Sequence, residues 1–185
     1  MKKLLLLLLI ITVATLSAQQ KFTFDKNGLT DFVVVKTDSG LTQNYLFEKT
    51  INWVKERYKN PDAVFKSFID NEKIRIEGFS EDLICYIHLG LYNCYSATYS
   101  ITISFKDGRY KFDPVSLYYH IPVSEYYPTG GIVNIYLNSS NSSFYKKNGK
   151  IRSSYRSIPG EIEWLFNRLN NNLKEYIETD GDNDW

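Results

Sequence analysis

The sequence predicts an α+β fold with an antiparallel sheet and two helices, and three observations support this. Runs of alternating apolar and polar residues, typical of half-buried strands, occupy the middle of the chain. Two stretches on either side of this region repeat apolar residues every three or four positions, as helices do. Asp107-Gly108 sits between alternating residues and is typical of a tight hairpin turn. Strands in runs with helices set apart from them indicate α+β.

The N-terminal part of the fold is predicted to be one strand and one helix. Residues 31–36, DFVVVK, are short and rich in β-branched residues, which indicates a strand buried largely on both faces. The helix covers residues 42–59, with Thr42 as its N-cap. Asn60-Pro61 ends it, because proline disfavours helical backbone at the residue before it.

Residues 63–69 and 73–79 are predicted to be consecutive strands joined by a polar turn at 70–72. In the second strand Ile74 and Ile76 alternate with three charged residues, so one face of the sheet is expected to meet solvent. The charged residues are Lys73, Arg75 and Glu77.

The segment YSITISFKDGRYKFDP predicts a hairpin with a defined register. If Asp107-Gly108 is the centre of the turn, residue 105 lies opposite 110 and residue 103 opposite 112, so large apolar side chains share one face. The other face then carries Thr98, Ser100, Thr102, Ser104, Lys111 and Asp113.

The C-terminal part is predicted to contain a further hairpin and a second helix. Residues 131–137 form a strand, and the NSSNSSFYKKNGK segment that follows forms a polar loop or loose hairpin. Apolar residues from Ile158 to Ile177 line one face of the helix, with Pro159 near its first turn. This helix is expected to cover the apolar face of the sheet.

The N-terminus is typical of a secretory signal peptide, because two lysines precede a short apolar block and small residues follow it. Cleavage near Ala18 removes residues 1–18, and no stable membrane span is expected afterwards. Residues 22–178 are then one domain, followed by a flexible acidic tail at 179–185. The remaining 20 basic and 21 acidic residues give a net charge of −1, which does not favour a nucleic acid as partner.

Both cysteines lie in the stretch CYIHLGLYNC, which admits several interpretations. If Leu89-Gly90 is the centre of a hairpin turn, Cys85 lies directly opposite Cys94, within disulfide distance. We therefore favour a disulfide, with two buried free thiols as the alternative. A metal site or a Cys–His catalytic pair is disfavoured, because residues 85 and 88 of one strand point to opposite faces.

Four segments together resemble domain of unknown function 4468, a family of exported bacterial proteins. They are DFVVVK, the helix with NYLFEKTINWV, FIDNEKIRIEGF and the ITISFKDGRYKF hairpin, and the match covers about residues 29–119. The resemblance implies a TBP-like fold, β-α-β-β-β-β-α, with a curved antiparallel sheet and both helices on one face. It also implies an envelope or secreted location and brings no catalytic residues. Residues 121–157 are an insertion outside the match, with an extra hairpin before the C-terminal helix.

No sequence motif for a nucleophile, a phosphate-binding loop or a metalloprotease occurs in the chain. We expect a secreted or periplasmic, non-enzymatic binding or interaction module without a cofactor or metal. Its partner would be a protein, a peptide or an envelope ligand. The alternatives are a structural accessory of a cell-envelope assembly and an enzyme with a cryptic site. The candidate interaction surface is the polar face of the sheet, or the tyrosines beside the insertion, Tyr118, Tyr119, Tyr126 and Tyr127.

Overall fold

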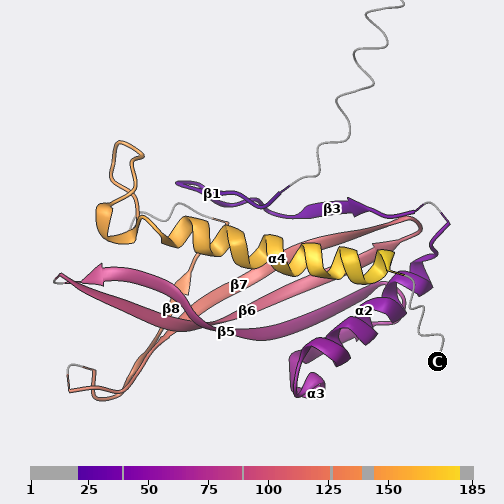
Figure 1. Cartoon of the computed structure of the whole chain (residues 1–185), viewed down its shortest axis with the longest axis horizontal. Helices are drawn as coiled ribbons and strands as arrows, with labels where there is room; N and C mark the ends of the chain where they lie inside the picture. The colour runs from indigo at the N-terminus through magenta and orange to yellow at the C-terminus, as the bar shows by residue number, and fades with distance from the viewer. Residues whose placement is uncertain (1–20, 39, 89, 126, 139–143, 180–185) are drawn as a thin grey trace, which may run out of the picture.

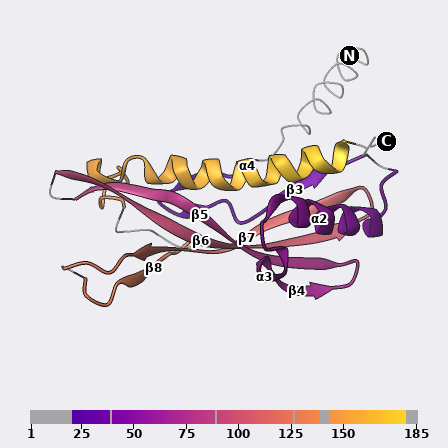
Figure 2. The ribbon, with the colours of Figure 1, turned by 60° about the horizontal axis from the view of Figure 1, so that its bottom comes forward.

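The computed structural model describes residues 21–38, 40–88, 90–125, 127–138 and 144–179, except for the side chain of His88. The fold is α+β, as predicted: a twisted, unclosed antiparallel sheet carries the two long helices on one face (Figures 1 and 2). We call the opposite side the open face. The predicted signal peptide lies outside the described residues, as does the tail from residue 180 onward.

The main sheet has six strands in the order β3-β7-β6-β5-β4, and β8 also pairs with β7. Their bounds are β3 (Val33–Lys36), β4 (Phe65–Ile69), β5 (Lys73–His88), β6 (Leu91–Lys106), β7 (Arg109–Ile121) and β8 (Gly131–Ile135). A small hairpin of β1 (Phe24–Asp25) and β2 (Gly28–Leu29) precedes it. The helices are α2 (Gln43–Arg57), α3 (Pro61–Val64), a 3-10 turn η1 (Ser153–Tyr155) and α4 (Ile158–Glu178).

Helix α2 begins and ends where the sequence predicts. The Thr42 side chain accepts a hydrogen bond from the backbone N–H of Tyr45, which satisfies a donor that the first turn would otherwise leave unpaired. Asn60 then caps the short helix α3, which has Pro61 at its first position. The proline therefore separates two helices as well as ending the first.

The predicted hairpin register is confirmed, with Phe105 opposite Tyr110 and Ile103 opposite Phe112. All four of these side chains are buried beneath the helices. Strand β7 has a register shift at Val115, beside Pro114. A bulge tolerates a proline in an inner strand, because the ladder there does not require its missing N–H.

Strands β5 and β6 are longer than the sequence indicated. The predicted strand at 73–79 and the hairpin around the cysteines are parts of the same two strands, separated by a bulge in which residues 81–83 lie opposite one residue of β6. Asp82 takes a positive φ of 47° there. Beyond the bulge Cys85 lies opposite Cys94, and the predicted disulfide is present with a Cα–Cα distance of 4.1 Å.

The prediction that residues 31–36 form a strand buried on both faces is wrong. β3 is an edge strand in which Val33 and Val35 are buried, whereas Val34 is 38% exposed. The helices cover only one face, so a run of apolar residues in β3 places every second side chain on the open face.

The core lies between the sheet and the helices, and Tyr99 is one of its tightest points. Its hydroxyl lies 2.8 Å from that of Tyr58 after α2, and its ring packs edge-on against Phe166 of α4. Gly78 lies opposite Tyr99 in the ladder and leaves room for the ring. A Cβ at Gly78 would lie 2.4 Å from the Tyr99 ring, so any side chain there would collide with it.

The N-terminal segment is held by residues far along the chain. The backbone N–H of Phe22 donates to the Asn167 side chain, which in turn donates to the Phe22 carbonyl. The N–H of Leu29 donates to the carbonyl of Leu137, just beyond β8. Within the described ranges, no helix combines the length and apolar character that a membrane span requires.

Candidate binding face of the sheet

The open face brings together the polar residues that alternation predicted. Lys73, Arg75 and Glu77 of β5 lie across the ladder from hydroxyl-bearing residues of β6, which in turn lie across from Lys111 and Asp113 of β7. The structure adds two cations that the sequence did not single out, Lys106 and Arg109, which face each other beside the β6–β7 turn.

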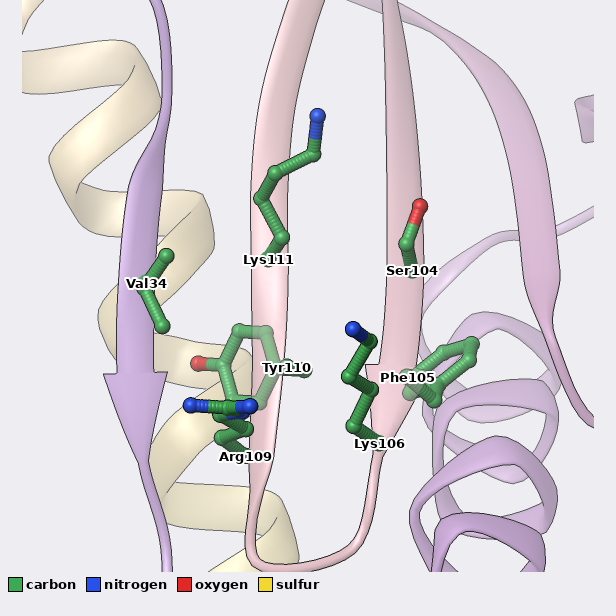
Figure 3. A pocket seen from close by; sticks show the side chains of 7 residues that line it. All are labelled: Val34, Ser104, Phe105, Lys106, Arg109, Tyr110 and Lys111. Atoms are coloured by element: carbon green, nitrogen blue, oxygen red, sulfur yellow. The ribbon is translucent and has the colours of Figure 1, made fainter.

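A hollow of about 300 Å³ lies at this end of the open face, and we call it the first basic hollow. Figure 3 shows Lys106, Arg109 and Lys111 around it, with Val34 and Ser104 beside them. Phe105 and Tyr110 also line it, but their rings lie toward the helices (Figure 3). The hollow forms because β3 pairs with β7, which places Val34 next to Lys111.

The three cations differ in their partners. The Lys111 ammonium lies 2.7 Å from a carboxylate oxygen of Asp113 and 4.8 Å from the centre of the Phe32 ring. Lys106 and Arg109 form no ion pair with any carboxylate that the structure describes. No acidic residue lines the hollow in the part of the chain that the structure describes, so its cations would attract an anionic group.

The β6–β7 turn beneath the hollow is fixed from outside the hairpin. The Asp107 carboxylate accepts a hydrogen bond from the Gln43 backbone N–H at 2.8 Å, and so caps the start of α2. The Gly108 N–H donates a hydrogen bond to the Leu41 carbonyl, and the Gly108 carbonyl accepts one from the Thr37 N–H. The one carboxylate of this turn is therefore hydrogen-bonded to α2, and hydrogen bonds from outside the hairpin hold the turn between Lys106 and Arg109.

An exposed aromatic group lies farther along the same face, and we call Phe79, Tyr118 and His120 the aromatic patch. The Phe79 side chain is 57% exposed, and its ring centre lies 6.1 Å from that of His120. The Tyr118 ring lies 5.4 Å from His120, whose Nε2 is 2.9 Å from the Thr98 hydroxyl. Thr98 lies six positions before Ser104 in β6, which places the patch about 20 Å from the first basic hollow.

The predicted tyrosine surface is not one continuous surface. Tyr118 is on the open face, whereas Tyr119 points to the helix side and contacts the rings of Tyr86 and Tyr95. Tyr127 is exposed in the β7–β8 connection, and Tyr126 lies outside the described residues. Neighbouring residues of a strand point to opposite faces, so Tyr118 and Tyr119 cannot contact the same flat ligand.

The tyrosines on the helix side have little scope for proton transfer. Burial is the largest cause that raises the pKa of Tyr86, Tyr99 and Tyr110 above the usual phenol value, and it also raises that of Tyr119. Their hydroxyls are therefore protonated near neutral pH. They act as hydrogen-bonding and packing groups.

The cysteine stretch contributes a covalent link. Cys85 and Cys94 are bonded to each other, so neither offers a thiolate to a metal or a substrate. The prediction that His88 points away from Cys85 falls on a side chain outside the described part. No cluster of histidine, cysteine and acidic side chains suited to a metal ion occurs among the described residues.

Sequence reasoning missed Lys106, Arg109 and Phe79 as surface residues. Extending the alternating pattern of β5 two residues beyond Glu77 would have placed Phe79 on the open face. The hairpin register already places Lys106 opposite Arg109. The hollow itself could not be found this way, because it depends on the distant strand β3.

Comparisons with known proteins agree with this architecture. The sequence matches no protein-family model and no curated protein. Solved structures with a similar fold include a DUF4468 family protein from Bacteroides ovatus, with a TM-score of 0.61 and 11% identity over 84% of this chain and 90% of that one. A TBP-like protein from Parabacteroides distasonis has a TM-score of 0.53 and 11% identity over 80% of this chain and 91% of that one. At this identity the likeness concerns the fold, and it agrees with the resemblance seen in the sequence.

Proposed function

We propose that this protein is an extracytoplasmic, non-enzymatic binding module whose open face holds an acidic segment of a partner protein or peptide. The first basic hollow is the observation that carries the proposal. Its cations surround about 300 Å³ of accessible space without a lining carboxylate, and a fixed turn supports them. An anion entering it would displace little existing structure.

The aromatic patch supports an extended ligand. A strand-like peptide rises about 3.3 Å per residue, so about six residues would reach from the first basic hollow to the patch. A ligand with acidic residues at one end and an aromatic residue at the other would match both regions. Exposed aromatic rings are enriched at interfaces, because they bury a large area and lose little conformational entropy.

The extracytoplasmic part of the proposal has its own support. A disulfide between Cys85 and Cys94 persists in oxidising compartments and is uncommon in the cytosol. The N-terminal sequence has the layout of a secretory signal peptide.

Fluorescence anisotropy with defined peptides tests the binding proposal. The probe is an eight-residue peptide with three glutamates at one end and a tyrosine at the other, and its counterpart carries lysines in place of the glutamates. We expect the acidic peptide to bind and the lysine peptide not to bind. The double variant Lys106→Ala/Arg109→Ala should weaken binding about tenfold or more, because it removes two charge-assisted contacts.

A matched control removes two exposed cations that line neither basic hollow, with Lys55→Ala/Lys59→Ala, and should leave the peptide affinity unchanged. Phe79→Ala should weaken binding of the acidic peptide but have no effect on a variant peptide that lacks the tyrosine. Equal affinity for the acidic and lysine peptides, or equal losses in the two double variants, would show that the open face is not the binding surface.

A further inference from the structure

A second basic hollow lies at the opposite end of the molecule from the first, beside β1 and beyond the N-terminal end of α4 (Figure 1). It encloses about 600 Å³, within the size range of ligand sites. Four cationic side chains line it, and none of its lining residues within the described ranges is acidic. The cations are Lys26, Lys146, Lys147 and Arg152.

The hollow is built from two segments that are distant in the sequence. Lys26 comes from the turn between β1 and β2, and the other cations come from a small hairpin closed by a bridge between Tyr145 and Ile151. The hairpin turns at Gly149, whose φ of +78° suits glycine. The Arg152 N–H donates to the Phe144 carbonyl at 2.9 Å and extends the pairing.

The two segments are in contact with each other. A Cβ at Gly149 would lie 3.5 Å from Cδ of Lys26, so the stem of this lysine packs over the turn. The hairpin is tied to the same region by the Tyr145 hydroxyl, which lies 3.5 Å from the Phe24 carbonyl. The cations are therefore gathered by the fold, with Lys26 held against the hairpin.

The carboxylates near this hollow already have other partners. Asp25 accepts a hydrogen bond from the Asn27 N–H at 2.7 Å, and Glu163 accepts one from the Phe24 N–H at 2.7 Å. None of the four cations forms an ion pair with a carboxylate in the part of the chain that the structure describes. Like charges held together repel each other, and a bound anion reduces that repulsion.

We propose that this second basic hollow binds a phosphoryl group, either as free phosphate or on a lipid headgroup. Free phosphate and a phosphomonoester headgroup carry up to two negative charges and three or more strong acceptor oxygens, so each can contact several cations at once. A carboxylate offers one charge and two oxygens. Arginine is suited to bidentate contact with phosphate oxygens, and lysines add point charges around it. The inference does not depend on the function proposed for the open face.

Two binding measurements test this proposal and separate the two sources. The first is equilibrium dialysis of the exported protein with radiolabelled inorganic phosphate. The second is co-sedimentation with phosphatidylcholine vesicles that either contain or lack phosphatidic acid, whose headgroup is a phosphomonoester. We expect binding in at least one measurement, and for vesicles only when the anionic lipid is present. Vesicle binding without binding of free phosphate would identify the headgroup as the source.

The triple variant Lys26→Gln/Lys147→Gln/Arg152→Gln should bind at least tenfold more weakly. The control variant Lys55→Gln/Lys59→Gln/Lys66→Gln removes three exposed cations that line neither hollow and should bind like the wild type. Circular dichroism should show that both variants are folded. The proposal is overturned if neither phosphate nor anionic vesicles bind to the wild type, or if the two triple variants weaken binding equally.

Discussion

Gly78 should not tolerate even a methyl group, and the expected cost can be worked out from the structure. An alanine Cβ would lie 2.4 Å from both Cζ and Oη of Tyr99 and 2.8 Å from Cε2. Carbon atoms in contact normally lie about 3.5–4.0 Å apart. The Tyr99 ring is only 3% exposed and must therefore shift by about 1 Å or more within a packed core.

Two effects add to the cost of Gly78→Ala. Overpacking a core costs about 1–3 kcal/mol, and loss of the hydrogen bond between Tyr99 and Tyr58 costs about 1 kcal/mol. We expect the free energy of unfolding to fall by about 2–4 kcal/mol. At about 3 °C per kcal/mol for a domain of this size, Tm should fall by roughly 6–12 °C. Urea denaturation and thermal melts followed by circular dichroism measure both quantities.

Two comparisons identify the collision as the cause. In a Tyr99→Leu background the shorter side chain leaves room for a methyl group, so Gly78→Ala should change stability by less than about 1 kcal/mol. Gly160→Ala in α4 introduces a Cβ with no atom within 4 Å, and it should stabilise the protein by about 0.5–1 kcal/mol. Equal costs of Gly78→Ala in the wild-type and Tyr99→Leu backgrounds would refute the reasoning.

Three further predictions concern the disulfide, the helix cap and alkaline pH. Cys85→Ala/Cys94→Ala should lower the free energy of unfolding by about 2.6 kcal/mol, which is the chain-entropy value for a separation of 9 residues. A loss below about 1 kcal/mol in chemical denaturation would contradict this prediction. Thr42→Ala should cost about 1 kcal/mol, whereas Thr42→Ser should keep most of the stability if the side-chain oxygen is what matters. Burial raises the pKa of Tyr99 and Tyr110 above the unfolded value of about 10. Their contribution to stability is therefore complete below about pH 10, and each should lose about 1.4 kcal/mol per pH unit above it, because only the unfolded state releases the proton. Chemical denaturation at increasing pH should show this slope, and Tyr110→Phe should reduce the slope. A free energy of unfolding that stays constant above about pH 10 would contradict this prediction.

Local signals predicted the hairpins well. Asp107-Gly108 fixed the register of β6 against β7 as far as the bulge at Val115, because a two-residue turn determines the opposite pairs of an uninterrupted ladder. The same reasoning, applied to the turn between β5 and β6, correctly placed Cys85 opposite Cys94. In both cases the information lies within a few residues of the turn.

The features that the sequence did not predict depend on contacts between segments that are distant in the chain. The bulge at residues 81–83 interrupts an alternation that otherwise continues, so the pattern indicated separate strands. DFVVVK is typical of a fully buried strand, yet the helices cover only one face of the sheet and leave Val34 exposed on the other. The first basic hollow needs β3 beside β7, a pairing that no pattern within either strand specifies.

The candidate site was predictable only in part. The charged and hydroxyl residues of the open face followed from alternation, whereas the tyrosines were grouped by nearness in the sequence. A strand separates such neighbours, and Tyr119 accordingly packs with Tyr86 on the helix side. Nearness in the sequence is therefore a poor guide to a shared surface within a strand.

The N-terminal segment has its partners late in the chain, and this bears on when the protein can fold. Phe22 is hydrogen-bonded to Asn167 of α4, and Leu29 is hydrogen-bonded to Leu137. Strand β3 pairs with β7. Contacts of such large separation are slow to form, because a long loop must close first. During synthesis or translocation, the residues that follow the predicted leader would wait unpaired until α4 had emerged. The topology thus favours a chain that completes its fold only late, once α4 is available to the N-terminal segment.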